Sequence, residues 1–143
     1  MIRISEFGSD EYKLLVGLRD FVLRKPLNLV FTKEQLDAEE NEIHIGYWSE
    51  DDNPLGVLLL RPLENGVIKM RQVAVHPHQQ GRGIGQLLVE YSENYAKNLG
   101  YSIMELNARL EAVPFYEKLN YIKKGEQFTE VNIPHFKMVK DLN

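Results

Sequence analysis

The sequence contains no cysteine among its 143 residues. This absence excludes disulfide bonds, zinc sites with thiolate ligands and a cysteine nucleophile. Long hydrophobic runs are also missing, because the longest apolar stretch, residues 54–60, is far shorter than the roughly 20 residues that span a bilayer. The first residues carry no apolar segment of the kind found in a signal peptide. We therefore expect no membrane association and a cytoplasmic location.

Positive charge is in deficit, with 17 lysine and arginine residues against 21 aspartate and glutamate residues and a formal net charge of −4. General affinity for nucleic acid or for an anionic membrane requires a positive surface, so neither partner is expected. His76 and His78 flank a proline without neighbouring carboxylates or thiolates, which predicts loop residues and no metal site. A chain of this length without linkers or repeats predicts a single domain over residues 1–143.

The spacing of apolar residues changes between a helical period and a strand period along the chain. Ser9 or Asp10 is expected to cap the first helix, Pro26 to end it, and residues 32–35 to form a capping box for a second helix. Asn65-Gly66 is typical of a tight hairpin turn. The expected strands are residues 2–4, 43–48, 55–60, 67–75 and 102–108 with a last pair within 121–140, and two further helices follow residue 85 and cover 112–119. This order predicts an α/β (α+β) fold with a mixed, mostly antiparallel sheet flanked by helices.

The helix that follows residue 85 is expected to be amphipathic and to end at Gly100. Its polar face is predicted to carry Glu90, Glu93 and Lys97. Its buried face is predicted to comprise Leu87, Leu88, Tyr91, Tyr95 and Leu99.

The stretch "HPHQQGRGIG", residues 76–85, places three glycines and an arginine between a predicted strand and that helix. Free backbone N–H groups and the helix dipole at such a junction favour a bound anion, and Arg82 adds a full positive charge. A tight turn without a ligand is the alternative. A nucleotide P-loop would need Lys-Ser or Lys-Thr after its last glycine, and a dinucleotide fingerprint would need glycine or alanine where Gln86 stands.

Residues 80–85, "QGRGIG", match the [QR]-x-x-G-x-[GA] signature of the GNAT superfamily of N-acetyltransferases. The resemblance extends to "VAVHP" before the loop, to the helix after it and to "ARLEAVPFYEKLNYIKKG" further along. From "LRDFVLRKPL" to "EVNIPHFKMVKDL" the chain is also similar to the ElaA-like subgroup. The resemblance implies a single-domain GNAT fold with two central strands that splay apart at a slot for acetyl-coenzyme A.

The resemblance also implies where the cofactor lies. Backbone groups of Val73, Ala74 and Val75 would bond the pantetheine arm like an added strand, with the side chains of Val73 and Val75 in the core. N–H groups from Gly81 to Gly85 would bind the pyrophosphate. The cofactor-binding residues expected from the resemblance are Val73, Ala74, Val75, Gln80, Gly81, Arg82, Gly83, Ile84, Gly85 and Asn107.

The implied reaction moves an acetyl group to a primary amine by direct transfer in a ternary complex, which the lack of cysteine also favours. The resemblance assigns Tyr116 to protonate the departing thiolate, and the alternative for this residue is a core aromatic. The backbone N–H of Val75 would stabilise the oxyanion. The general base is open, because Arg71 and Gln72 stand where many relatives place an acidic residue, and removal of the proton through water is an alternative.

Four residues are candidates for the acceptor side of the site: Arg19, Arg71, Glu130 and His135. His135 could accept a proton near neutral pH, whereas ordinary surface or structural hydrogen bonds are the alternative for it and for Glu130. For Arg19 the alternative is a surface salt bridge. The expected acceptor is a small molecule or a peptide, and homodimers are common for this fold. A non-catalytic acyl-coenzyme A sensor and a dinucleotide oxidoreductase are the rival functions.

Overall fold

The computed structural model describes residues 1–143, which divide into two compact units. The first unit comprises residues 1–61 and 71–92, and the second comprises residues 62–70 and 93–143. Strand β4 (Val67–Val75) and helix α3 (Ile84–Asn98) run through both. No helix is long and apolar enough to cross a membrane. Each unit is described below by itself.

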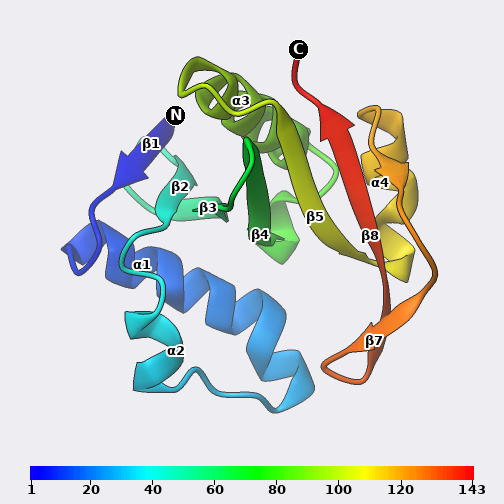
Figure 1. The fold of residues 1–143 in the computed structure, drawn as a ribbon. Coiled ribbons are helices and arrows are strands. Elements are labelled where there is room, and N and C mark those ends of the chain that lie inside the picture. The colour runs from blue at the N-terminus through cyan, green and yellow to red at the C-terminus, as the bar shows by residue number, and fades with distance from the viewer. The chain divides into compact units, whose positions relative to one another are not determined.

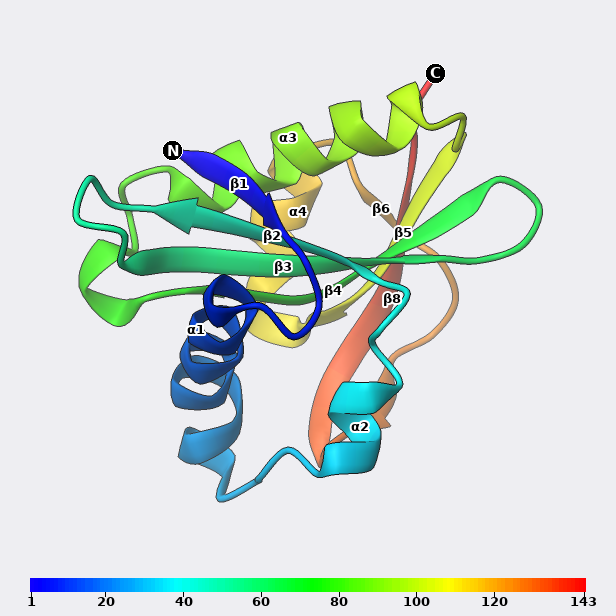
Figure 2. The ribbon, with the colours of Figure 1, turned by 90° about the vertical axis from the view of Figure 1, so that its left-hand side faces the viewer.

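The sheet of the first unit is antiparallel. Strand β1 (Ile2–Ser5) pairs with β2 (Ile43–Trp48), and β2 pairs with β3 (Pro54–Pro62) (Figure 2). The backbone N–H of His76 donates to the carbonyl of Leu55 at 2.8 Å, which fastens the end of β4 to the start of β3. Three of the predicted strands therefore lie side by side in the first unit.

The two N-terminal helices of this unit begin at the expected caps. The Ser9 hydroxyl accepts from the backbone N–H of Tyr12 at the start of α1 (Asp10–Arg19). Thr32 forms a complete capping box for α2 (Lys33–Asp37). The end of α1 was predicted wrongly, because the α-helix stops before Pro26 and continues as a π-helical turn (Asp20–Arg24) and a 3-10 turn (Lys25–Leu27).

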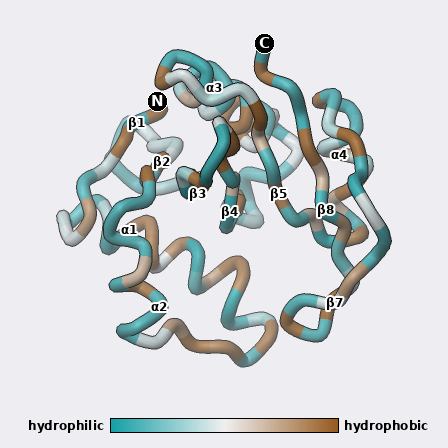
Figure 3. The backbone as a smooth tube through the Cα atoms, in the orientation of Figure 1, coloured by the Kyte–Doolittle hydropathy of each residue, from teal (hydrophilic) through white to brown (hydrophobic).

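Helix α1 and the first half of α3 cover opposite faces of β2 and β3 (Figure 2). Two glycines allow the close approach: a Cβ atom at Gly46 would lie 2.7 Å from a Leu15 methyl carbon, and one at Gly56 would lie 2.8 Å from a Leu88 methyl carbon. Leu15, Leu18, Trp48, Val57 and Ala74 form the buried cluster beneath α1. Hydrophobic and hydrophilic residues alternate along α1 as this packing requires (Figure 3).

The second unit is built around the pair of β5 (Ile103–Arg109) and β8 (Ile133–Asp141), which are antiparallel (Figure 1). Strands β6 (Ile122–Lys123) and β7 (Phe128–Glu130) both pair with β8 at different positions, so the C-terminal region holds three strands where two were predicted. Helix α4 (Val113–Lys118) follows a 3-10 turn and carries Pro114 in its first turn, as expected.

The first half of β4 runs parallel to β5 over only four residue pairs, from Val67↔Ile103 to Met70↔Leu106. Both strands continue beyond that ladder, to Val75 and to Arg109, as the expected splay requires. The hairpin turn before β4 has Asn65 and Gly66 at φ of 58° and 76°, as its sequence predicts. The mixed, mostly antiparallel sheet flanked by helices is confirmed.

The buried face of α3 differs from the prediction, since Leu87 and Leu99 are 47% and 53% exposed. Leu88 is buried as predicted, and the other buried residues of the helix are Ile84, Val89, Ser92 and Ala96. Ser92 can lie in the core because its hydroxyl donates to the carbonyl of Leu88 at 2.8 Å. This hydrogen bond meets the cost of burying a hydroxyl, which a count of apolar residues does not anticipate.

Candidate active site

The glycine-rich loop joins β4 to α3 within the first unit. Gly81 and Gly83 have φ of 81° and 82°, a conformation that favours glycine. A Cβ atom added at either residue would meet no other atom within 4 Å, so the space beside both glycines is open. The helical bonds of α3 begin with the Leu87 N–H donating to the Gly83 carbonyl. The N–H groups that precede this bond have no helical acceptor and are available to an anion.

The loop is tied back to the strand by Gln80, whose Nε2 donates to the carbonyl of Val75 at 3.2 Å. Because the N–H of His76 points towards β3, the N–H groups of Val73 and Val75 point to the other side of β4. Those two groups have the direction that an added, strand-like ligand would need. The N–H of Ala74 shares the direction of His76 instead.

The side chains of this segment correct one prediction. Val73 and Val75 are half-buried, and it is Ala74 that lies in the core. Gln72, the residue before Val73, has a φ of 55° and interrupts the extended backbone of β4. A non-glycine residue in this region is uncommon and re-aims the residues that follow it.

Two predicted acceptor-side residues, Arg19 and Arg71, converge on one carboxylate. Arg19 is completely buried and binds Glu39 with both terminal nitrogens, at 2.9 and 2.7 Å, so it does not make the surface salt bridge considered as an alternative. Arg71 Nη1 lies 3.4 Å from Glu39 and 2.7 Å from a Glu42 oxygen. Glu42 also accepts from Arg61 at 3.2 and 3.1 Å. The first unit therefore holds three arginines around two buried carboxylates.

Tyr116 lies on α4 in the second unit and is 7% exposed. Its ring contacts those of Phe115 and Tyr121 edge to face, with centroids 5.0 and 5.7 Å apart. Burial raises the pKa of the Tyr116 phenol well above its usual value, so its ionised form is disfavoured in the folded protein. The phenol is thus a proton donor set among aromatic rings, which is compatible with both an acid and a core aromatic.

His135 and Glu130 lie on the hairpin of β7 and β8. The Nδ1 atom of His135 lies 2.8 Å from the Ile133 carbonyl oxygen, and its ring stacks on Phe128. Its Nε2 lies 3.6 Å from a Glu130 oxygen. Because a carbonyl can only accept, Nδ1 carries the proton and the neutral ring has its lone pair on Nε2. His135 can therefore accept a proton beside a carboxylate.

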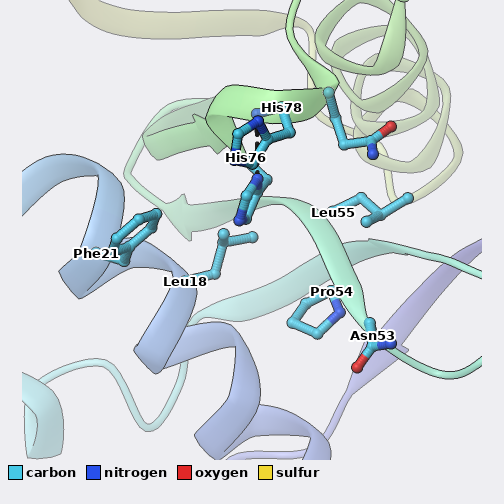
Figure 4. A pocket seen from close by; sticks show the side chains of 8 residues that line it. Leu18, Phe21, Asn53, Pro54, Leu55, His76 and His78 are labelled. Carbon is cyan, nitrogen blue, oxygen red and sulfur yellow. Dashed lines mark hydrogen bonds between the residues drawn. The ribbon is translucent and has the colours of Figure 1, made fainter.

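A pocket of about 510 Å³ lies beside the start of the loop, within the first unit (Figure 4). Figure 4 shows Phe21 from the π-helical turn beside His76 and His78 from the loop, and the three rings are stacked in pairs. Nδ1 of His76 accepts from the backbone N–H of His78. His76 precedes a short 3-10 turn at the start of the loop (Pro77–Gln79), and His78 lies within that turn. No group of three or more potential ligand residues is placed to hold a metal ion.

A family model described as "Acetyltransferase (GNAT) domain" matches residues 23–142. The chain belongs to the GNAT acetyltransferase family. It is 31% identical over 135 residues to the uncharacterized N-acetyltransferase YjcF of Bacillus subtilis, an alignment that covers 94% of this chain and 95% of the relative.

Solved structures of the same fold include Escherichia coli ElaA, with a TM-score of 0.84, 19% identity and coverage of 98% of this chain and 99% of that chain. An aminoglycoside 6'-N-acetyltransferase complexed with coenzyme A has a TM-score of 0.83 and 17% identity, and covers 100% of this chain and 97% of that chain. GNAT acetyltransferases use acetyl-coenzyme A, and the loop of this chain fits that substrate. It offers open space at two left-handed glycines, a helix N-terminus and, in Arg82, a cation for phosphate.

Asn107 is the first residue of β5 after the ladder with β4, and it pairs in register with Lys137 of β8. It is half-buried. Its backbone lies where β5 loses its parallel partner, which is where a strand-like ligand would find unpaired groups on this strand.

Glu39 and Glu42 were not identified as site residues from the sequence. They lie in the turn between α2 and β2, within the acidic stretch "DAEENE", residues 37–42. Their neighbour Glu40 is exposed, so residue type does not distinguish buried from exposed carboxylates here. Their position three residues apart in a hydrogen-bonded turn is the one local signal, since the Glu42 N–H donates to the Glu39 carbonyl.

Proposed function

We propose that this GNAT acetyltransferase transfers an acetyl group from acetyl-coenzyme A directly to a primary amine. The observation that carries the proposal is the loop from Gly81 to Gly83, with its open space and its position before α3. The family match supports the same substrate.

Acetyl-coenzyme A supplies an activated thioester whose carbonyl carbon the amine nitrogen attacks. The C–N bond forms, the C–S bond breaks, the amine loses a proton and the coenzyme A sulfur gains one. The Val75 N–H, directed away from β3, would donate to the carbonyl oxygen as that atom gains negative charge. Tyr116 would protonate the sulfur, since its phenol carries a proton at neutral pH.

The amine must be neutral to attack, although an unperturbed lysine-type amine has a pKa of about 10.4. His135 is our candidate for the proton acceptor, acting at Nε2 directly or through a water molecule. The carboxylate of Glu130, 3.6 Å from that nitrogen, would stabilise the imidazolium that forms. Arg19 and Arg71 are bound to buried carboxylates, so we propose that they shape the acceptor side of the site and do not take the proton.

The acceptor is proposed to be a primary amine on a small molecule or a peptide. The test is release of free coenzyme A thiol from acetyl-coenzyme A against a panel of such amines. Tyr116→Phe is expected to lower kcat by about 100-fold, the lower range for a lost general acid, with KM for acetyl-coenzyme A changed little. Tyr121→Phe is the matched control, because it removes a neighbouring buried phenol that donates to Glu93.

Amine-dependent release that falls in Tyr116→Phe and not in Tyr121→Phe would support both the reaction and the acid. Equal kcat in wild type and Tyr116→Phe would remove Tyr116 from the mechanism. Binding of coenzyme A without release for any amine would favour an acyl-coenzyme A sensor. No binding at all would show that the loop has another role.

A further inference from the structure

Gln72 is held in an unfavourable state immediately before the segment proposed to bind acetyl-coenzyme A. Its φ of 55° lies in the left-handed region, which costs a side chain more than it costs glycine. Its side-chain Oε1 is buried and accepts no hydrogen bond from the protein. Such a conformation persists only where surrounding contacts impose it.

Arg71, the residue before Gln72, contacts two buried carboxylates. A single nitrogen, Nη1, lies between the carboxylates of Glu39 and Glu42, whose side chains are both 3% exposed. The two carboxylates belong to the turn between α2 and β2, so Arg71 fastens β4 to a different part of the first unit. Charged hydrogen bonds of this kind are strong when they are shielded from water.

The partners of Arg71 are themselves fixed. Glu39 is bound by both terminal nitrogens of Arg19, and its backbone carbonyl oxygen lies 3.1 Å from His44 Nε2. Glu42 is bound by Nε and Nη2 of Arg61. Arg71 therefore reaches a preorganised pair of carboxylates from its place next to Gln72.

The left-handed residue decides where the following N–H groups point. With Gln72 in this conformation, His76 bonds to β3 while Val73 and Val75 direct their N–H groups to the other side of β4. A residue that returned to ordinary extended geometry at position 72 would rotate the peptide groups after it.

We infer that Arg71 is a positioning residue for acetyl-coenzyme A: its contacts with Glu39 and Glu42 hold Gln72 left-handed and so aim the backbone of Val73 and Val75. The inference rests on the proposed function, because it assumes that these backbone groups bind that substrate. Arg71 acts through the strand and does not touch the substrate itself.

The test compares two arginines that share the Glu42 carboxylate. Arg71→Met removes the contact made from β4, and Arg61→Met removes the one made from β3. Coenzyme A affinity is measured by titration calorimetry, and unfolding in urea is measured beside it. Arg71→Met is expected to weaken affinity at least tenfold, whereas Arg61→Met changes it less than threefold while also lowering stability. The coenzyme A affinity of Arg71→Lys, which keeps the charge, is expected to lie between that of the wild type and that of Arg71→Met. Arg71→Lys replaces Arg71→Met in the test if Arg71→Met does not fold.

Gln72→Gly provides the rescue. Glycine adopts a φ of 55° without a side-chain penalty, so Gln72→Gly added to Arg71→Met or Arg71→Lys is expected to recover most of the lost affinity. Equal losses in the Arg61 and Arg71 variants, or no recovery with Gln72→Gly, would overturn the positioning role while leaving the proposed function intact. Failure of the wild-type protein to bind coenzyme A would overturn the proposed function, and this inference with it.

Discussion

Each unit of the molecule contains a shielded carboxylate that binds two side chains, and the partners differ in kind. In the first unit Glu39, with a side chain 3% exposed, is bound by the guanidinium groups of Arg19 and Arg71. In the second unit Glu93, 12% exposed, accepts from the ammonium group of Lys140 at 2.9 Å and the phenol of Tyr121 at 2.8 Å. Guanidinium groups stay charged at any ordinary pH, whereas a phenol is neutral and can lose its proton.

The difference matches what each unit is proposed to do. The first unit is proposed to direct backbone N–H groups at a substrate, with permanently charged side chains holding the chain in place. The second unit carries Tyr116 and His135, whose proposed tasks are to give and to take protons. Burial raises the pKa of Tyr116, and burial followed by the negative charge of Glu93 raises that of Tyr121. The carboxylate of the first unit thus has only permanently charged side-chain partners, whereas that of the second unit also binds a phenol that can ionise.

Glu39→Gln tests the first half of this comparison and should have the largest effect on stability. It leaves Arg19 buried with a neutral partner, and breaking a buried ion pair in this way costs about 3–5 kcal/mol of unfolding free energy. Urea denaturation measures the loss. Glu40→Gln is the matched control, since Glu40 is exposed in the same turn and its replacement should leave the midpoint unchanged. Similar small losses in both variants would contradict the role given to Glu39.

The buried carboxylates also show which kind of feature could not be predicted from the sequence. The glycine-rich loop at Gly81, the capping box at Thr32 and the turn at Asn65 were predicted because each depends on residues within a few positions. Glu39 contacts arginines 20 and 32 residues away, so its burial depends on the packing of α1 and β4. No pattern within "DAEENE" contains that information.

The candidate site likewise contains features that were predicted from the sequence and a feature that was not. The residues expected to bind the pyrophosphate were predicted by glycine chemistry and by a resemblance, and the structure gives them open space and a helix start. The left-handed conformation of Gln72 was not predicted, because glutamine has no preference for it. The π-helical turn after α1 was also not predicted from the sequence.

Glu93→Gln tests the second half of the comparison. It should lower the unfolding free energy by less than Glu39→Gln does, about 1–3 kcal/mol. A glutamine oxygen can still accept from the Tyr121 hydroxyl, and Lys140, 23% exposed, can turn towards water. The same urea measurement on Glu39→Gln and Glu93→Gln gives the difference directly. A loss in Glu93→Gln equal to or larger than that in Glu39→Gln would mean that the type of partner does not decide the cost.

Unfolding at alkaline pH tests the comparison further and has the smallest expected effect on the unfolding free energy. The pKa of Tyr116 and that of Tyr121 are raised in the folded protein, so their stabilisation is complete below the unfolded value of about 10 and is lost as the pH rises above it. Each phenol should reduce the unfolding free energy by about 1.4 kcal/mol per pH unit in that range, until its folded pKa is reached. Urea curves at pH 9 and pH 11 measure the slope, and Tyr116→Phe should remove one phenol's share of it. An unchanged slope in Tyr116→Phe would mean that this hydroxyl ionises as readily in the folded protein as in the unfolded chain, which would contradict the raised pKa of Tyr116.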